Sequence, residues 1–384
     1  ILETDANELS TRVIDLVTPI GMGQRGRKVR VMLRQSSKMD ALAGLDVDVV
    51  YGDVLDPASL RAAMQGCGTL FYSVVDPRFW LTDQTPIYRN NVEGLENAID
   101  AALETGIDRF IFTSSMGTLG FNPDGPVTED IPFNWLDRAP PYIHARLEAE
   151  NRFLAACRTK GLPGIALCVA NTYGPEDYQP TPHNGNLWEM ASGKARIAVD
   201  VSQPTVDIRD VAEAAVLAEA RGGIGERYII ANEFVRNRVI YTRATELTGH
   251  RPPIFMPYAL AYSIAWIAGH VGKVMGRKDM MLTTNALYLS NAFREMDSNK
   301  ARRELGWSLW RAFLFTLMFL PGTIIFPLLL AILVDRVEEP RLATLYRVLQ
   351  DWFPAAARQA KAQTWKGARP MLPDGPPAIG ASAV

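Results

Sequence analysis

The amino-acid sequence predicts an α/β protein with a doubly wound, Rossmann-like parallel sheet and a small C-terminal substrate lobe. From residue 29 onward, apolar segments of strand length alternate with segments of helix length. The strand candidates are apolar on both faces, which is typical of parallel strands that helices cover on both sides. Because 48% of the 384 residues are hydrophobic, the chain can bury a core of this kind.

The expected elements follow one another in β–α order. The strand candidates are Val29–Leu33, Asp46–Tyr51, Thr69–Val75, Arg109–Ser114 and Gly164–Ala170, and the helix candidates are Pro57–Gln65, Asn91–Leu103 and Arg146–Arg158. Asp56 and Pro57 are typical of a helix start, and Gly106 and Gly161 of helix ends. In a sheet of this kind, ligands bind at the carboxyl ends of the strands.

Composition narrows the class of protein. The net charge of −2 gives no reason to expect a nucleic-acid partner. Cys67, Cys157 and Cys168 lack the spacing of a metal site and are too few for a disulfide framework, so we interpret them as thiols in a reducing compartment. The lack of metal-site spacing also means that no bound metal is expected. The first residues, Ile1 to Thr11, are polar and hold no signal-peptide core, so a cytoplasmic catalytic domain is expected.

Two segments place reactive side chains where ligands should bind. Ser115 follows an apolar strand candidate, and Tyr142 and Arg146 lie four residues apart on one face of the next helix. A cation beside a phenol favours the phenolate and lowers a pKa that is normally near 10. Such a tyrosine can exchange a proton with a carbinol oxygen while a hydride moves to a nicotinamide. Either segment alone is more often structural, but together they favour this reaction.

These segments, RFIFTSSMGTLG and PPYIHARLEAEN, resemble the active-site segments of the extended short-chain dehydrogenases/reductases. The similarity is greatest to the epimerase/dehydratase, dihydroflavonol reductase and 3β-hydroxysteroid dehydrogenase groups. It continues in YGDVLDPASLRAAMQGC, NNVEGLENAIDAA, NTYGPEDYQPTPHNG, VDIRDVAEA and MDSNKARRELGW, from Val29 to Trp307.

The resemblance implies four catalytic residues. Ser115 would be the catalytic hydroxyl, Tyr142 the general acid/base, and Asn91 the support of a catalytic water network. Arg146 stands where this family usually has Lys. Because arginine keeps the charge but is not a point donor, we expect altered rather than abolished activity, with Arg146 biasing Tyr142 and reaching the ribose.

The resemblance also implies a nicotinamide cofactor, NADP or NAD. Arg34 resembles the residue that holds an NADP 2′-phosphate, so NADP is slightly preferred, and Asp53 would lie near the adenine. The cofactor-binding candidates are Arg34, Asp53, Val54, Ser73, Val74, Tyr142, Arg146, Asn171 and Tyr173.

The front of the domain departs from the family pattern. Gly21 to Gly26 spells G-x-G-x-x-G, which binds a pyrophosphate only where it follows a strand and opens a helix. If Val13–Val17 is that strand, only Thr18 to Lys28 separate it from the next, too few for a crossover helix. We therefore expect the first βα unit to be shortened or replaced, and the glycines to form a loop. A shortened phosphate turn is the alternative.

The C-terminal part also departs from the family. Ala312 to Val334 is uncharged and long enough to span a membrane, and the alternative is a buried hairpin hinged at Pro321-Gly322. The segment QDWFPAAARQAKAQTWKGARPMLPDGPPAIGAS resembles a piece of D-amino acid dehydrogenases, but it lacks a flavin-binding βαβ unit. The expected parts are an atypical N-terminal segment (1–28), a Rossmann-like dinucleotide-binding domain (29–175), a substrate lobe (176–308), an apolar segment that is a candidate membrane span (309–334) and a tail (335–384).

The sequence thus predicts an NAD(P)-dependent reductase or dehydrogenase acting on a hydroxyl or ketone of a small apolar substrate. Trp80, Phe133, Trp135 and Trp188 are candidates for lining its pocket. A nucleotide-sugar epimerase or dehydratase is less favoured, because few basic residues are placed to hold a diphosphate. A non-catalytic or membrane-tethered scaffold that lost its cofactor turn is the third alternative. Membrane contact and a homodimer are left open.

Overall fold

The computed structural model describes residues 28–78 except 38, 40, 41 and 43, then residues 83–175, 182–274 and 284–307. The expected first strand, the G-x-G-x-x-G segment, Trp80, the apolar segment 309–334 and the tail lie outside these residues. Within the described ranges, no helix has both the length and the apolar character that crossing a bilayer requires.

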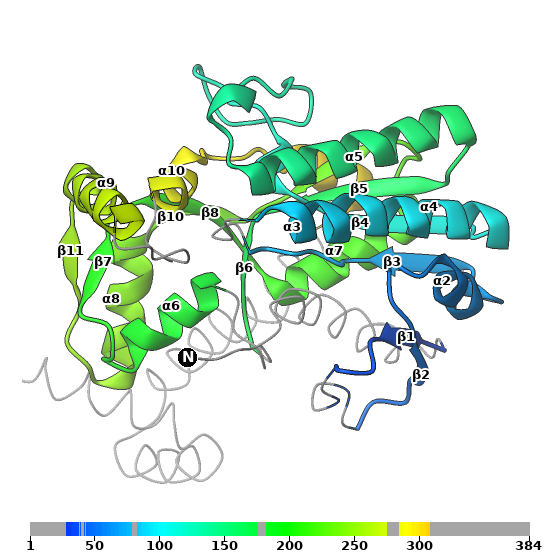
Figure 1. Cartoon of the computed structure of the whole chain (residues 1–384), viewed down its shortest axis with the longest axis horizontal. Helices are drawn as coiled ribbons and strands as arrows, with labels where there is room; N and C mark the ends of the chain where they lie inside the picture. Colours follow the sequence, from blue (N-terminus) through cyan, green and yellow to red (C-terminus); the bar gives the residue numbers. More distant parts are fainter. Residues whose placement is uncertain are drawn as a thin grey trace, which may run out of the picture. The chain divides into compact units, whose positions relative to one another are not determined.

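The described part is built on parallel strands, as predicted (Figure 1). The larger sheet has the order β3 (Thr69–Tyr72), β4 (Arg109–Ser115), β5 (Gly164–Val169) and β9 (Arg227–Ile230), with every pair parallel. A separate parallel pair is formed by β1 (Arg30–Leu33) and β2 (Asp48–Tyr51). The strand order requires crossover connections, and helices provide them. The predicted α/β fold class is therefore confirmed.

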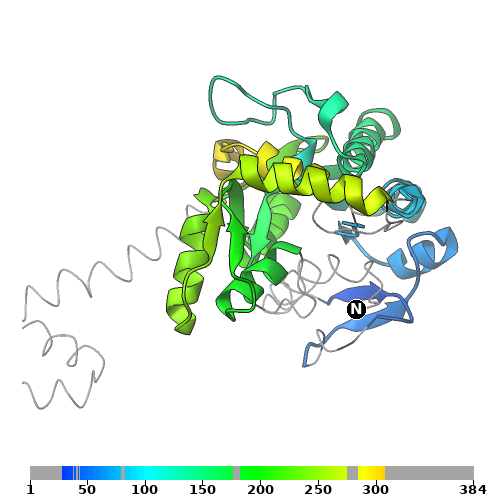
Figure 2. The ribbon, with the colours of Figure 1, turned by 60° about the vertical axis from the view of Figure 1, so that its left-hand side comes forward.

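Helices cover both faces of the larger sheet (Figures 1 and 2). One face carries α4 (Gly94–Thr105) and α5 (Pro141–Lys160), and the other carries α7 (Ile208–Arg221). Alternation along β4 explains this: Phe110 and Phe112 belong to the core under α4 and α5, whereas Ile111 belongs to the core under α7. A strand that is buried on both faces reads as a continuous apolar segment.

The helix ends follow the expected chemistry. Helix α2 (Pro57–Met64) begins after Asp56, whose carboxylate accepts a hydrogen bond from the Ala58 amide. Helices α4 and α5 end at Gly106 and Gly161, which adopt the left-handed conformation with φ of 72° and 70°. Such a conformation favours glycine because it has no Cβ.

Two helix starts were predicted too late in the sequence. The helix expected to begin at Asn91 is preceded by α3 (Thr85–Tyr88) and by a π-helical turn, η3 (Arg89–Glu93), which leads directly into α4. Helix α5 likewise begins at Pro141 rather than near Arg146, because Pro suits the first turn of a helix. Inserted π turns are frequent at functional sites, and η3 carries Asn91.

A second group of elements accompanies the larger sheet. Strands β6 (Asn171–Tyr173), β8 (Ser202–Asp207) and β10 (Glu233–Arg236) form one small sheet, and β7 (Ile197–Val199) pairs with β11 (Ile254–Met256). The helices among them are α6 (Pro182–Ala191), α8 (Asn237–Thr248), α9 (Tyr258–Val274) and α10 (Thr284–Ala292). Because α7 and β9 return to the larger sheet, this group is interleaved with it in the sequence.

A cavity of about 630 Å³ separates the two parallel sheets. Its walls include β1 from Arg30 to Met32 and β3 from Thr69 to Tyr72, with Ser73 and Val74 beyond the strand end. Within the described residues, β1 pairs only with β2 and β3 pairs only with β4. Of the cofactor candidates, Val54 after β2 and Ser73 and Val74 after β3 line this cavity.

Candidate active site

Ser115 is the last residue of β4, at the carboxyl end of a central strand. It is half-buried, and its Oγ accepts a hydrogen bond of 3.1 Å from the Gly117 amide. This bond caps a short 3-10 turn, η4 (Met116–Thr118), which redirects the chain away from the sheet. The strand and the cap together fix the position of the hydroxyl.

Tyr142 is the second residue of α5, which packs against both β4 and η4. The close approach depends on Gly117: a Cβ atom there would lie 2.5 Å from Ile143 Cδ1. Ile143 is buried, so it has little room to move. The start of α5 is therefore held against the turn that Ser115 caps, and the two predicted hydroxyls lie at the same end of the sheet.

Arg146 is buried, with 2% of its surface exposed. Its Nη2 donates to the Thr113 carbonyl at 2.7 Å, and its Nη1 donates to Asn91 Oδ1 at 3.4 Å. The guanidinium carbon also lies 5.3 Å from the centre of the Phe112 ring. The structure thus joins Arg146 to Asn91, two residues that the sequence placed in one site.

The pKa of Tyr142 differs in direction from the sequence expectation. Burial raises the pKa of the phenol above its usual value, Arg146 opposes this, and Asp76 adds to it. The predicted effect of the cation is present, but the loss of hydration on burial is larger. The expectation of a net lowered pKa was therefore wrong, and the neutral phenol is the favoured form near neutral pH.

Asn91 is buried in the π turn η3 and uses its whole side-chain amide. Its Nδ2 donates to the carbonyls of Ile87 at 2.9 Å and Asp76 at 3.1 Å, and its Oδ1 accepts from the Asp76 amide at 3.1 Å. With Arg146 on the same oxygen, the amide is fully oriented. It links η3, α5 and the segment after β3.

The cofactor candidates lie where strands end. Arg34 directly follows β1 and is half-buried, and its carbonyl accepts from the Ser37 amide in a turn. Asp53 follows β2, where its carboxylate accepts from the Leu55 amide at 2.8 Å. The other candidates after β2 and β3 are Val54, which is buried, Ser73, which is buried, and Val74, which is half-buried. Val54, Ser73 and Val74 line the cavity, whereas Arg34 and Asp53 are not among its lining residues.

The last two candidates belong to an uncharged polar network on β6 and β8. Gln203 accepts from Asn171 Nδ2 at 2.6 Å and donates to Tyr173 OH at 2.8 Å and to Asn237 Oδ1 at 2.8 Å. Burial raises the pKa of Tyr173. Burial lowers the pKa of the neighbouring His183, whose ring meets Tyr173 edge-on, to about 4. Near neutral pH, every member of this network is uncharged.

Three of the aromatic lining candidates make other contacts. Trp135 is buried, donates to the Leu119 carbonyl at 2.9 Å and stacks on Phe121, so it packs the loop between η4 and α5. Trp188 is exposed on α6, with the Lys194 ammonium 3.9 Å from its ring centre. Phe133 packs against Trp135. These three side chains stabilise local structure.

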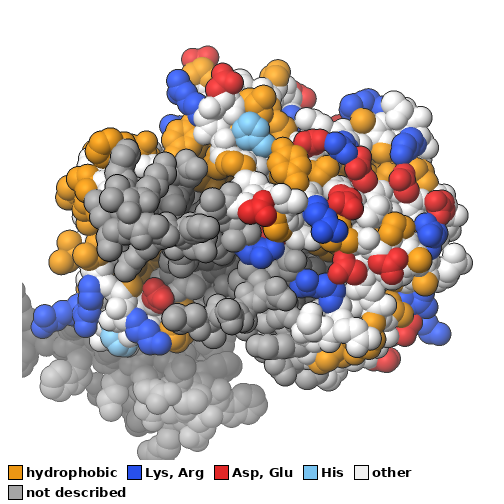
Figure 3. Space-filling model, in the orientation of Figure 1, with side chains coloured by type: hydrophobic (Ala, Val, Ile, Leu, Met, Phe, Trp, Pro, Cys, Tyr) orange, Lys and Arg blue, Asp and Glu red, His pale blue; other side chains and the backbone are white. Residues whose placement is uncertain are grey.

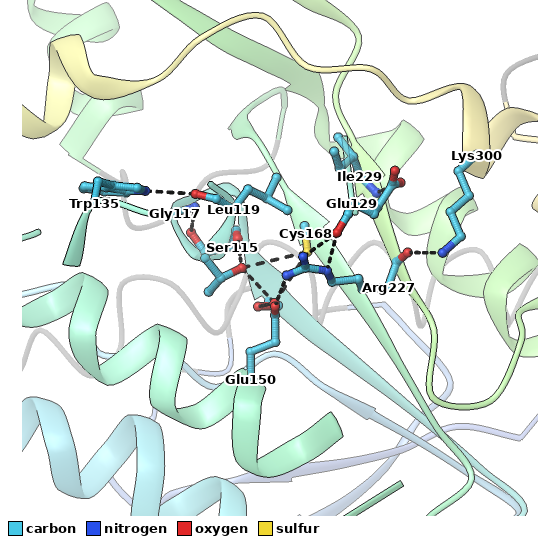
Figure 4. Close-up of polar contacts among 12 residues, drawn as sticks. Ser115, Gly117, Leu119, Glu129, Trp135, Glu150, Cys168, Arg227, Ile229 and Lys300 are labelled. Atoms are coloured by element: carbon cyan, nitrogen blue, oxygen red, sulfur yellow. Dashed lines mark hydrogen bonds and ion pairs between the residues drawn. The ribbon is translucent and has the colours of Figure 1, made fainter. Parts of the chain in front are cut away.

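A buried charged cluster under the Ser115 strand end was missed by sequence reasoning (Figure 4). Glu150 is fully buried, pairs with Arg227 at 3.0 Å, and accepts hydrogen bonds from Ser114 and Thr118. Arg227 also donates to the Glu129 carbonyl. The sequence did offer one signal for the burial of Glu150: it lies four residues after Arg146, and so on the same face of the helix.

The chain is similar to a known protein family and to several known proteins. Residues 22–231 match the NAD dependent epimerase/dehydratase family. The chain is 30% identical over 284 residues to sterol demethylase protein B of Methylococcus capsulatus, covering 73% of this chain and 86% of that protein. It is 27% identical over 293 residues to 3beta-hydroxysteroid-dehydrogenase/decarboxylase isoform 1 of Arabidopsis thaliana, covering 70% and 65%.

Solved structures agree on the fold. The crystal structure of gox2253 superposes with a TM-score of 0.69 at 30% identity, covering 78% of this chain and 91% of that one. A double mutant of the dTDP-glucose 4,6-dehydratase DesIV from Streptomyces venezuelae, which has NAD bound, superposes with a TM-score of 0.60 at 18% identity, covering 76% and 87%. At this low identity, the second likeness shows the fold alone.

The Glu150–Arg227 pair gives a direct test of how the strand end is held. Glu150→Gln should lower the free energy of unfolding by about 3 kcal/mol, because it leaves the half-buried Arg227 guanidinium without the fully buried carboxylate that it pairs with. Glu148→Gln on the same helix is the matched control. Its partner Arg152 is exposed, so the loss should stay below about 1 kcal/mol.

Denaturant unfolding of the two variants and of Glu150→Gln/Arg227→Gln provides the measurement. The double variant should lose less than Glu150→Gln alone. A Glu150→Gln variant as stable as Glu148→Gln would contradict the role given to the pair.

Proposed function

The chain belongs to the NAD-dependent epimerase/dehydratase family of extended short-chain dehydrogenases/reductases, and we propose that it is a nicotinamide-dependent reductase that acts on a ketone or hydroxyl of a small apolar substrate. The observation that carries this proposal is the packing of α5 against η4, which brings Tyr142 and Ser115 to one end of the sheet. The family is one of NAD-dependent enzymes.

The state of Tyr142 supports reduction as the direction near neutral pH. Because burial raises the pKa of its phenol, Tyr142 keeps its proton there and can donate it to a carbonyl oxygen. Ser115, held by its bond to Gly117, can donate a hydrogen bond to the same oxygen. A bound nicotinamide would supply the hydride to the carbonyl carbon. Arg146 counters part of the burial effect and so eases the loss of the proton.

The residues at the strand ends are suited to a dinucleotide. A Rossmann-like sheet binds its cofactor at the carboxyl ends of the strands. Arg34 directly follows β1, and Ser73, which follows β3, lines the cavity between the two parallel sheets. Arg34 offers a guanidinium, which matches a phosphate in shape and charge. This favours NADP over NAD within an NAD-dependent family.

The uncharged network on β6 and β8 favours an apolar or neutral substrate over a nucleotide sugar. Its members offer amides, a phenol and a neutral imidazole, and none carries a charge that would pair with a diphosphate. The nearby Arg236 and Arg238 both pair with Asp200, and Arg209 pairs with Asp207. These three guanidinium groups already have carboxylate partners.

The charge distribution argues against a nucleic-acid partner. On the face drawn in Figure 3, acidic and basic side chains are interspersed over α4 and α5. Several of them form ion pairs, including Arg152 with Glu96 and Lys160 with Asp100. A nucleic-acid site would need a continuous basic surface.

The proposed chemistry predicts the effect of removing the phenol oxygen. Tyr142→Phe should lower turnover of a ketone substrate by roughly 10² or more, the scale of general acid/base catalysis, with little change in cofactor affinity. Steady-state turnover and cofactor affinity, measured on the same preparation, check this. Full activity in a folded Tyr142→Phe variant would remove Tyr142 from the mechanism.

The cofactor preference has its own test in NADPH and NADH binding by calorimetry. The wild-type chain should bind NADPH more tightly, and Arg34→Ala should lose that advantage while NADH binding changes little, because only the 2′-phosphate contact is lost. Arg61→Ala, an exposed arginine on α2, is the control and should leave both affinities unchanged. Equal wild-type affinities would reject the preference, and no binding of either would favour the scaffold alternative.

A further inference from the structure

Asp76 is a fully buried carboxylate in the segment that follows β3. Arg78 donates to it three times, from its backbone amide at 3.2 Å, from Nε at 2.8 Å and from Nη2 at 2.6 Å, and Asn90 Nδ2 donates at 3.0 Å. Burial works against its ionisation, but these hydrogen bonds outweigh burial and keep the pKa of Asp76 below its usual value. Asp76 is therefore a buried anion near neutral pH.

The main chain of Asp76 is tied to the active site. Its amide donates to Asn91 Oδ1 at 3.1 Å, and its carbonyl accepts from Asn91 Nδ2 at 3.1 Å. The same Asn91 oxygen accepts from Arg146. Two hydrogen bonds thus connect the backbone of Asp76 to the side-chain amide of Asn91, which in turn accepts from the guanidinium of Arg146.

Two charges of the described residues act on the Tyr142 phenol: Arg146 on its own helix, and Asp76 from the segment after β3. The elements α3, η3 and α4 also pack against α5. Their charged residues form ion pairs: Arg89 with Glu93, Glu96 with Arg152, Asp100 with Lys160, and Glu104 with Arg61. Arg146 therefore lowers the pKa of the phenol and Asp76, the ion-pair partner of Arg78, raises it.

We propose that Asp76 is a positioning residue for the acid/base step: its carboxylate, held by Arg78 and Asn90, is the anion that balances Arg146, and its peptide orients the Asn91 amide against that guanidinium. This inference rests on the proposed function of Tyr142. It concerns a residue that does not touch the substrate and acts through its neighbours.

The sign of the effect follows from the charges. An anion near a phenol disfavours the phenolate and raises the phenol pKa, so removing the anion lowers it. In Asp76→Asn, Arg78 also loses its counter-charge, which acts in the same direction. The pH at which alcohol oxidation gains its phenolate base should therefore fall, by on the order of one pH unit or more.

The experiment is an ultraviolet titration of Tyr142 in the full chain, taken as the difference between each variant and the same variant carrying Tyr142→Phe. The variants are wild type, Asp76→Asn and Asp83→Asn. Asp83 is exposed, and its carboxylate accepts a hydrogen bond from the Thr85 amide. The substitution Asp83→Asn therefore removes an equal charge without changing the contacts of Asn91. The expected result is a lower midpoint in Asp76→Asn alone. Because Asn lacks the second acceptor oxygen for Arg78, Asp76→Ser serves as a second neutral variant with more space, and the same shift is expected.

The pH profile of turnover should move with the titration. A Tyr142 midpoint that is equal in wild type and in a folded neutral variant overturns the inference, whatever the activity. Absence of any reductase turnover by the wild-type chain would instead overturn the proposed function. The two outcomes are distinguishable because the titration of Tyr142 needs no substrate.

Discussion

The interaction on which the site depends is the pair of hydrogen bonds made by the buried guanidinium of Arg146. One bond holds the Thr113 carbonyl on β4, and the other holds Asn91 on η3, while the side chain itself comes from α5. These three elements carry Ser115, Asn91 and Tyr142 respectively. A charge with 2% exposure is costly to leave unpaired, so the guanidinium keeps the three elements in one arrangement.

The face of α5 toward the sheet extends this constraint. Tyr142, Arg146 and Glu150 follow one another at intervals of four residues, and Phe153 continues the same stripe onto Phe110 and Phe112. Polar groups with specific partners thus occupy the end of the helix near the site, and aromatic packing occupies the rest. Because the polar contacts lie in a region of low dielectric, each is strong when paired and costly when broken. The same helix face therefore both positions the candidate site residues and packs the core.

The sequence predicted what local patterns determine. Apolar segments identified β4 and β5, and the four-residue spacing of Tyr142 and Arg146 placed both on one face of the helix that follows. It did not predict the anion at Asp76, because burial of that carboxylate depends on Asn90 and Arg78 folding around it. The Glu150–Arg227 pair joins residues 77 positions apart, which no periodicity connects. The direction in which the pKa of Tyr142 shifts was also predicted wrongly. It depends on burial of the phenol, which outweighs the effect of Arg146 and which the sequence does not show.

The measurement that tests this account most directly is the free energy of unfolding of Arg146→Lys against wild type. Lysine is the residue that the family usually has there, so a site that needs only a positive charge would accept it. We expect Arg146→Lys to lower the free energy of unfolding by about 2 kcal/mol, because an ammonium cannot match the planar guanidinium across Thr113 and Asn91. An Arg146→Lys variant as stable as wild type would contradict the claim that these two hydrogen bonds hold the site together.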